Sequence, residues 1–278
     1  MILTRSLGEF KKAFESLPHK ESIGFVPTMG ALHEGHISLV ESAGKRCSHV
    51  IVSVFVNPTQ FNDKEDLAKY PRTLEADAAL LERIGVSILF APQVEDIYPQ
   101  EDKRVFDFGG LDKYGEGPYR PGHFNGVAQV VTRLFDIVQP KCAFFGEKDY
   151  QQLAIVRYFT KALKYNIEII GCPIIRESDG LARSSRNTLL TPQQREAAPH
   201  IYRTICKARV LKQSLTPQEV IERLQEEIES TGLLKSEYIE IVDGTTLKPI
   251  TQWSESGNPR LWCAVYAGSV RLIDNISL

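Results

Sequence analysis

The alternation of short apolar runs with helix-patterned stretches constrains the fold of this chain more than any other feature of its sequence. Five runs are continuously apolar or nearly so, at residues 23–26, 50–56, 86–90, 143–145 and 167–170. Such runs are typical of parallel strands that are covered on both faces. Since apolar residues at helical spacing occupy the stretches between them, we expect an α/β fold with a Rossmann-like, doubly wound parallel sheet.

Four helices are expected from the spacing of apolar residues, over residues 37–47, 74–84, 127–138 and 153–163. The third has the clearest period, with valines and a leucine at i, i+3, i+4, i+7 and i+11, followed by Pro140. Gly85 follows the second helix at the position where a left-handed residue commonly ends a helix.

The pattern changes after about residue 176. Thr191 with Gln194 and Thr216 with Glu219 form two capping boxes, each with proline at the first helical position. Three β-like runs follow at 238–242, 261–266 and 270–273, with short loops that favour a small antiparallel sheet with helices on one face. We therefore expect two domains, a Rossmann-like domain at 1–176 and a smaller α+β domain at 177–278.

Charge and composition exclude several classes of protein. Lys and Arg number 33 against 35 Asp and Glu, so a nucleic-acid partner is not expected. The five cysteines have wide gaps and no C-x-x-C pair, which predicts reduced thiols. The first residues show no signal peptide, and the longest apolar run is far shorter than the ~20 residues of a membrane span. A cytoplasmic protein without a membrane partner is expected.

The usual nucleotide and hydrolase motifs are absent, because the chain has no Walker A sequence, no G-x-G-x-x-G and no G-x-S-x-G. In their place, PTMGALHEGH follows the first apolar run and opens the first helix. Ligands of open α/β sheets bind beyond the carboxyl ends of the strands, and a helix N-terminus attracts anions. Gly30 and Gly35 allow close backbone approach, and His33 and His36 share one helical face. This arrangement suits a polyphosphate.

Two other interpretations of the histidine pair remain open. One is a helix-capping histidine next to a surface histidine, without any ligand. The other is a zinc site, which would need a third ligand and does not have the H-E-x-x-H pattern.

Two further clusters suit phosphate groups. Gly146, Glu147, Lys148 and Asp149 end the fourth apolar run, where a lysine can reach a phosphate as a point charge. The segment 184–187, Ser-Ser-Arg-Asn, offers two hydroxyls and a guanidinium as an oxyanion clamp. Taken alone, the first can be an exposed charged turn and the second a polar linker. Together with the histidines they predict one site.

A fourth group suits a small polar organic substrate. Asn57 and Gln60 lie in FVNPTQF after the second run, where uncharged amides stand beside aromatic side chains. Gln152 follows Lys148 by one helical turn and can face the same cavity. His123, in a loop rich in glycine and proline, is interpreted as structural, and Thr73 as a helix N-cap.

The motifs PTMGALHEGH, FVNPTQF, YPRT, RPGHFNGV, FGEKDYQQL and DGLARSSRN, in that order, resemble those of the pantoate–β-alanine ligase family. The H-x-G-H element alone marks the wider nucleotidyltransferase superfamily. The resemblance extends from about residue 20 to 195. One departure is Arg183, at a position that resembles one usually apolar in the family, and its role stays open.

The resemblance implies a two-step ligase reaction. The pantoate carboxylate attacks the α-phosphate of ATP to give pantoyl adenylate and pyrophosphate, and β-alanine then displaces AMP to give pantothenate. It also implies Mg²⁺, a Rossmann-like domain, a C-terminal lid and a homodimer. Asp77 is then a candidate Mg²⁺ neighbour, with a helix-surface carboxylate as the alternative.

The resemblance also assigns roles to residues. It makes His33, His36, Lys148 and Arg186 catalytic, with His36 as the proton donor, and gives pantoate to Gln60 and Gln152, with Asn57 beside them. ATP contacts are implied for a larger set: Met29, Gly30, Ala31, Leu32, His33, Glu34, Gly35, His36, Gly146, Glu147, Lys148, Asp149, Ile175, Arg183, Ser184, Ser185 and Arg186.

Three other functions compete with this one. An adenylyltransferase that moves AMP onto a phosphate would need a more basic acceptor pocket than the amides provide. An aminoacyl-tRNA synthetase would be longer and carry a tRNA-binding appendage. A nucleotide sensor without activity would not need the pocket at Gln60.

Overall fold

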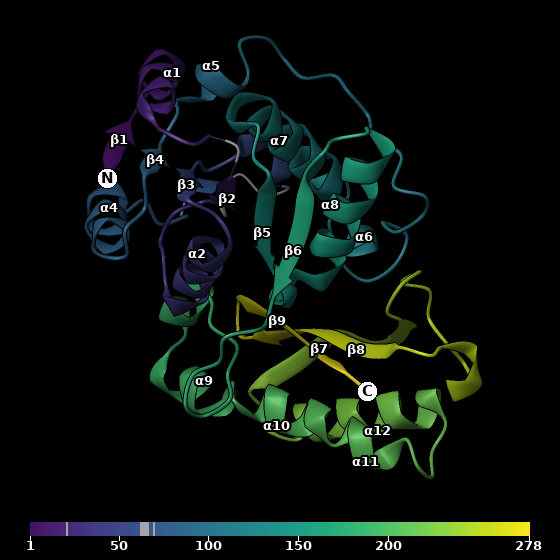
Figure 1. Ribbon diagram of the computed structural model, residues 1–278. Helices are drawn as coiled ribbons and strands as arrows, with labels where there is room; N and C mark the ends of the chain where they lie inside the picture. Colours follow the sequence, from purple (N-terminus) through teal and green to yellow (C-terminus); the bar gives the residue numbers. More distant parts are fainter. Residues whose placement is uncertain (21, 62–66, 69) are drawn as a thin grey trace. The chain divides into compact units, whose positions relative to one another are not determined.

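The computed structural model describes residues 1–20, 22–61, 67–68 and 70–278 (Figure 1). The chain forms two compact units. The first contains Met1–Gly109, Arg120–Glu147 and Ile155–Pro173, and the second contains Gly110–Tyr119, Lys148–Ala154 and Ile174–Leu278. The two short segments of the second unit were not expected from the sequence. The domain boundary at 176 and the lid function stay predictions.

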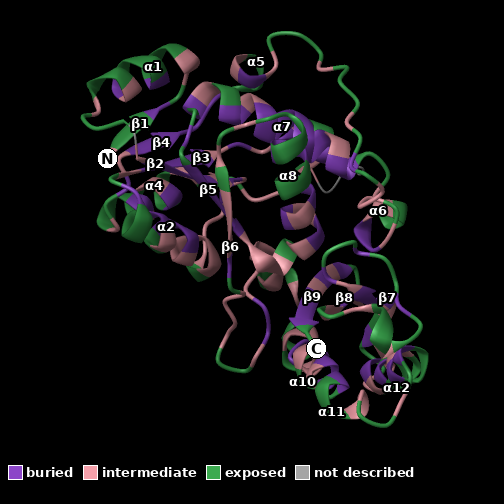
Figure 2. Ribbon diagram, turned by 45° about the vertical axis from the view of Figure 1, so that its right-hand side comes forward, coloured by how far each residue is buried: buried purple, intermediate pink, exposed green. Residues whose placement is uncertain are grey.

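The first unit is built on a six-stranded parallel sheet in the order β1-β4-β3-β2-β5-β6. Its strands are β1 (Ile2–Thr4), β2 (Ile23–Thr28), β3 (His49–Val54), β4 (Ile88–Phe90), β5 (Cys142–Gly146) and β6 (Glu168–Cys172). All five apolar runs are confirmed as parallel strands, and β1 is an additional edge strand. Figure 2 shows β2, β3 and β5 mostly buried.

The helices of this unit cover both faces of the sheet. They are α1 (Leu7–Ser16), α2 (Glu34–Arg46), α4 (Leu74–Arg83), α5 (Val94–Ile97), α7 (His123–Val138) and α8 (Tyr150–Ala162), whose first residues belong to the second unit. Val26 of β2 packs with residues of α2 and α4, whereas Phe25 points to the other face, where its ring contacts Phe135 of α7. This alternation confirms the doubly wound sheet and the four expected helices.

The second unit is built on an antiparallel sheet of β7 (Leu234–Asp243), β8 (Pro259–Ala267) and β9 (Val270–Ser277). On one face, α10 (His200–Cys206) and α12 (Pro217–Glu229) form an apolar core with it. On the other face, Tyr114 and Tyr150 pack around Trp262. The unit also contains α6 (Glu116–Tyr119), α9 (Pro192–Ala197) and α11 (Ala208–Leu211).

Local signals at the helix ends behave as expected. The threonine capping boxes at α9 and α12 are both present, each with its proline in the first turn. Gly85 has φ +79° after α4, which is the left-handed conformation that glycine adopts without steric cost.

All five cysteines are free thiols. Within the described residues, the helices are all too short or too polar to cross a bilayer.

Candidate functional site

The two histidines of the H-x-G-H element cap the same helix end. His33 is the N-cap of α2, and its Nδ1 accepts a hydrogen bond from the Gly35 amide at 3.1 Å. His36 Nδ1 accepts from the His33 amide at 3.3 Å, and the two ring centroids lie 4.1 Å apart. A ring that accepts at Nδ1 carries its proton on Nε2. Both imidazoles therefore become Nε2–H donors at a helix N-terminus, and the second is not the isolated surface histidine of the alternative interpretation.

The loop between β2 and α2 is strained and anchored. Gly30 and Ala31 both have left-handed backbones, with φ +83° and +51°. A Cβ on Gly30 would lie 3.0 Å from Val54 and 3.1 Å from Asp77 Oδ2, so only glycine fits closely. An alanine in this conformation costs about 1–2 kcal/mol, which the rest of the loop must offset.

Asp77 of α4 provides that anchor. Its Oδ2 accepts from the Ala31 amide at 3.0 Å, and its Oδ1 accepts from the Leu32 amide at 2.9 Å and from the Thr73 hydroxyl at 3.2 Å. The side chain is only 3% exposed, so the alternative of a helix-surface carboxylate is wrong. Both of its oxygens already hold protein groups.

The amide pair after β3 forms a tight local network in the 3₁₀ turn Pro58–Gln60, named η1. Asn57 is 1% exposed, and its Nδ2 donates to Gln60 Oε1 at 3.2 Å and to the Gly126 carbonyl at 3.0 Å. Gln60 Nε2 donates to Met29 Sδ at 2.8 Å, which brings the amide pair to the loop before α2. The network joins two of the predicted motifs, PTMGALHEGH and FVNPTQF.

Residues at the N-terminus of α7 contact the backbone of the η1 turn. His123 Nδ1 donates to the Gln60 carbonyl at 2.9 Å, which confirms a structural role for this buried histidine. A Cβ on Gly126 would come within 2.4 Å of the Thr59 carbonyl oxygen. The RPGHFNGV motif therefore contains glycine at this point because the helix and the turn are in direct backbone contact.

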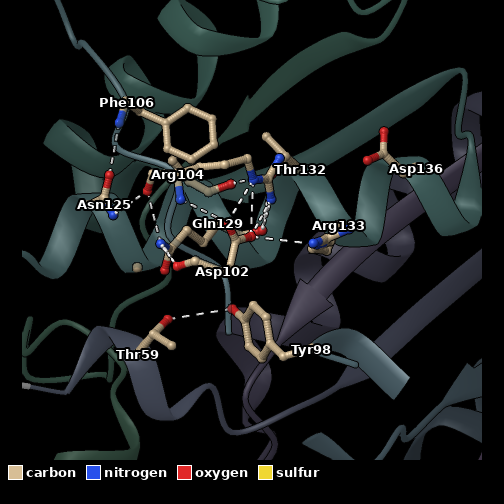
Figure 3. Close-up of polar contacts among 12 residues, drawn as sticks. Thr59, Tyr98, Asp102, Arg104, Phe106, Asn125, Gln129, Thr132, Arg133 and Asp136 are labelled. Carbon is tan, nitrogen blue, oxygen red and sulfur yellow. Dashed lines mark hydrogen bonds and ion pairs between the residues drawn. The ribbon is translucent and has the colours of Figure 1, made fainter. Parts of the chain in front are cut away.

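Figure 3 shows Tyr98 next to a second polar network, in which Asp102 contacts Arg104 and residues of α7. The Tyr98 hydroxyl donates to Asn57 Oδ1 at 2.9 Å. Asp102 is paired with Arg104 at 2.5 Å and with Arg133 at 3.5 Å, and its side chain is 2% exposed. The hydrogen bond from Arg104 lowers the pKa of the Asp102 carboxyl, against the opposing effect of burial.

Lys148 belongs to the second unit, at the 3₁₀ turn Glu147–Asp149 (η2) that follows Gly146 at the end of β5. The side chain is half-buried. Its carbonyl accepts from Asn275 Nδ2 of β9 at 2.9 Å, and Asn275 is 2% exposed. Gln152, four residues further along α8, is also half-buried. Strand β9 thus fixes the backbone that carries the lysine.

The remaining predicted residues lie on a hairpin-like segment of the second unit. The Arg183 amide donates to the Ile175 carbonyl at 2.9 Å, next to an antiparallel bridge between Arg176 and Ala182. Ser184 caps the 3₁₀ turn Ser185–Leu189 (η3), and its Oγ accepts from the Arg186 amide at 3.3 Å. The segment brings Ile175 together with the residues from Arg183 to Arg186, as a single site requires.

Glu177 organises the charges around this segment. Its carboxylate accepts from Asn187 Nδ2 at 2.9 Å and from Arg195 at 2.7 Å, and Arg183 lies 4.0 Å away. Burial raises the pKa of Glu177, but these hydrogen bonds outweigh it and lower the pKa overall. The unexpected charge of Arg183 therefore faces a carboxylate of its own unit.

Sequence reasoning missed three supporting residues of the site: Tyr98, Asn275 and Arg195. Each acts over a long separation in the chain, such as the 127 residues between Asn275 and Lys148. Their own neighbourhoods in sequence carry no motif. By contrast, the bond between His33 and His36 and the bond between Asn57 and Gln60 each join residues three apart, a spacing that is visible in the sequence.

Fold and site together define an α/β protein of the Rossmann-like class with an H-x-G-H helix cap. Residues 3–277 match the family described as Pantoate-beta-alanine ligase, and the chain belongs to that family. It is therefore an enzyme, a carbon–nitrogen ligase.

Relatives and solved structures agree with this assignment. The chain is 54% identical over 256 residues to the pantothenate synthetase of Bacteroides thetaiotaomicron, covering 92% of this chain and 91% of that protein. It is similar to the crystal structure of pantothenate synthetase from Thermus thermophilus, with TM-score 0.92, 44% identity and 99% coverage of both chains. It is also similar to the pantoate-beta-alanine ligase from Francisella tularensis complexed with beta-gamma ATP and beta-alanine, with TM-score 0.85, 39% identity, and 99% and 97% coverage.

Proposed function

We propose that this ligase joins pantoate to β-alanine at the expense of ATP through a pantoyl-adenylate intermediate, releasing pyrophosphate and then AMP. The observation that carries the proposal is the cap of α2, where two neutral imidazoles both present Nε2–H donors at a helix N-terminus. Family membership supports the overall reaction, and the donor pair supports phosphate chemistry as its first step.

In the first step, a carboxylate oxygen of pantoate forms a bond to the α-phosphorus, and the bond from that phosphorus to the pyrophosphate oxygen breaks. Negative charge grows on the phosphate oxygens, so preorganised donors are the main source of catalysis. We assign this role to His33, His36, Lys148 and Arg186, with Ser184 and Ser185 alongside. His36, whose Nδ1 accepts from the His33 amide, donates a hydrogen bond from Nε2 to a phosphate oxygen and keeps its proton.

In the second step, the amine of β-alanine attacks the acyl carbon. The new carbon–nitrogen bond forms as the bond to the AMP oxygen breaks, and the nitrogen loses a proton. Both nucleophiles come from the substrates, so the reaction needs no covalent intermediate on the protein.

We assign substrate selection to the amides. Gln60 keeps one N–H and one lone pair beyond its bonds to Met29 and Asn57, which suits the hydroxyls and carboxylate of pantoate. Gln152 is assigned to the same substrate. The loop from Met29 to His36 and the turn from Gly146 to Asp149 are assigned to ATP.

The resemblance also implies Mg²⁺ and a homodimer, and both stay predictions. Asp77 does not fit a principal metal ligand, because its oxygens hold the Ala31 and Leu32 amides. Among the residues that the structure describes, no three His, Cys, Asp or Glu side chains gather as a metal site would require. Mg²⁺ is often held chiefly by substrate phosphates, so we propose that it enters with ATP and derive no step through it.

Isotope exchange between ATP and pyrophosphate tests the proposal. Because the adenylate forms before β-alanine reacts, we expect exchange that requires pantoate and does not require β-alanine. Exchange without pantoate would indicate a different acid or acceptor. Absence of exchange under conditions where pantothenate is formed would reject the adenylate intermediate.

A further inference from the structure

We propose that Tyr98 is a positioning residue for the pantoate pocket, because its hydroxyl holds the amide of Asn57 and Asn57 in turn holds Gln60. The inference rests on the proposed function in one respect, that Gln60 binds pantoate. Neither Tyr98 nor its segment was among the residues that the sequence motifs indicated.

The contacts form a continuous chain. Tyr98 Oη lies 2.9 Å from Asn57 Oδ1, and Asn57 Nδ2 lies 3.2 Å from Gln60 Oε1. Asn57 is 1% exposed and Gln60 is 9% exposed, so water competes little for these groups. A buried amide that loses a partner is costly, which makes each link in the chain matter.

The partners of Asn57 fix which way its amide points. Oδ1 also accepts from the Thr59 amide at 3.3 Å, and that amide can only donate. Nδ2 faces the Gly126 carbonyl at 3.0 Å, and that carbonyl can only accept. The amide nitrogen must therefore face Gln60, which turns the Gln60 oxygen toward Asn57 and its nitrogen toward Met29. The orientation of the Asn57 amide therefore sets the orientation of the Gln60 amide toward a substrate.

Tyr98 is itself held in place by its surroundings. Its ring lies 6.3 Å from that of Phe55, and it directly follows α5. Four residues later, the Asp102 side chain is paired with Arg133 of α7, and Gln129 of α7 donates to the Asp102 carbonyl at 2.7 Å (Figure 3). Burial raises the pKa of Tyr98, which keeps the hydroxyl protonated as the donor. The segment from Tyr98 to Asp102 thus contacts the η1 turn through the phenol and α7 through Asp102.

The hydroxyl acts through Asn57 and not on the substrate, so its loss should affect binding of one substrate selectively. Tyr98→Phe removes only the oxygen and keeps the ring contact with Phe55. We expect the KM for pantoate to rise about 3- to 10-fold, the range expected for one neutral hydrogen bond. The KM for ATP should stay within about 2-fold, because the lost bond is on Asn57, which reaches Met29 of the ATP loop only through Gln60.

Tyr165→Phe is the matched control. Its hydroxyl donates to Asp136 at 2.7 Å in the same unit, and Asp136 lies ten residues beyond Gly126 on α7, about 15 Å along the helix axis. The experiment measures pantoate-dependent exchange at varied pantoate and varied ATP for both variants and the unmodified chain, together with their thermal midpoints. We expect the selective rise only for Tyr98→Phe, with midpoints similar for the two variants.

The outcomes separate the two proposals. If the unmodified chain shows no pantoate-dependent exchange, the proposed function fails. If it shows exchange and Tyr98→Phe leaves the pantoate KM unchanged, the positioning role is overturned. An equal rise in both KM values with a lowered midpoint would also overturn it, since that pattern indicates a general structural defect.

Discussion

Replacing Asp77 with asparagine should loosen the loop that carries the histidine pair. The carboxylate accepts the Ala31 and Leu32 amides, and asparagine can offer an oxygen to only one of them. We expect the oxygen to stay with Leu32 and the new amide nitrogen to face the Ala31 N–H. Ala31 then loses the bond that offsets its left-handed backbone, with φ +51°.

The magnitude follows from these contacts. A hydrogen bond to a charged group contributes about 1.5–3 kcal/mol, and a neutral acceptor at Leu32 is roughly half as strong as a charged one. Ala31 and Leu32 are half-buried, so water replaces part of what is lost. We expect Asp77→Asn to lower the free energy of unfolding by about 2–3 kcal/mol, measured by urea denaturation.

Glu75→Gln is the control for this experiment. Glu75 lies in the same first turn of α4, so it contributes the same charge to the helix N-terminus, but its side chain is 85% exposed. Its substitution should change stability by no more than about 0.5 kcal/mol. Unchanged stability of Asp77→Asn, together with a raised Mg²⁺ requirement for activity, would refute the anchoring role and favour a metal ligand.

Three further predictions concern other parts of the chain. Lys148→Ala should lower the exchange rate about 10²- to 10³-fold, with an unchanged thermal midpoint, if its donor follows the scale of an oxyanion hole. Gly126→Ala should lower the free energy of unfolding by about 1–3 kcal/mol, because the new Cβ would meet the Thr59 carbonyl oxygen. Gly44→Ala in α2 is the control, since its Cβ would meet no atom within 4 Å, and it should raise the free energy of unfolding by about 0.5–1 kcal/mol. Urea denaturation measures both changes. The lowered pKa of Asp102 means that the unfolded chain binds more protons near pH 4, so its stabilising contribution should disappear as the pH falls below about 4. Arg104→Gln should weaken this pH dependence, and an unaltered acid-unfolding curve in that variant would contradict the assignment.

The fold was largely predictable because its strands are buried on both faces and therefore apolar in sequence. Strand β1 was not predicted because it has only three residues, and because Ile2 and Leu3 are 43% and 36% exposed at the sheet edge. Helix α1 was not predicted although a signal was present, since the Ser6 hydroxyl accepts from the Glu9 amide and the Glu9 carboxylate accepts from the Arg5 amide at its start. Serine followed by glutamate three residues later is a sequence signal for a helix start.

The site was predictable where its residues are close in sequence and not where they are distant. A spacing of three placed His33 and His36 on one face, as their 4.1 Å ring separation confirms. The bond from the Leu32 amide to Asp77 joins residues 45 apart, and no periodicity in one sequence reveals such a pair. The charge of Asp77 suggested a metal, whereas its position shows that it holds the backbone.

The second unit is assembled from three separate stretches of the polypeptide, two of which are synthesised long before the third. The carbonyl oxygens of Leu111 and Tyr114 accept hydrogen bonds from the Gln151 side chain, and both residues pack against the apolar cluster that contains Trp262. A fragment that begins near residue 177 therefore lacks side chains that bury this cluster. On the ribosome, the stretches Gly110–Tyr119 and Lys148–Ala154 emerge without the β-strands they need. Cotranslational folding of this unit must therefore wait for the last strand, and dividing the gene at the apparent boundary would yield an incomplete C-terminal product.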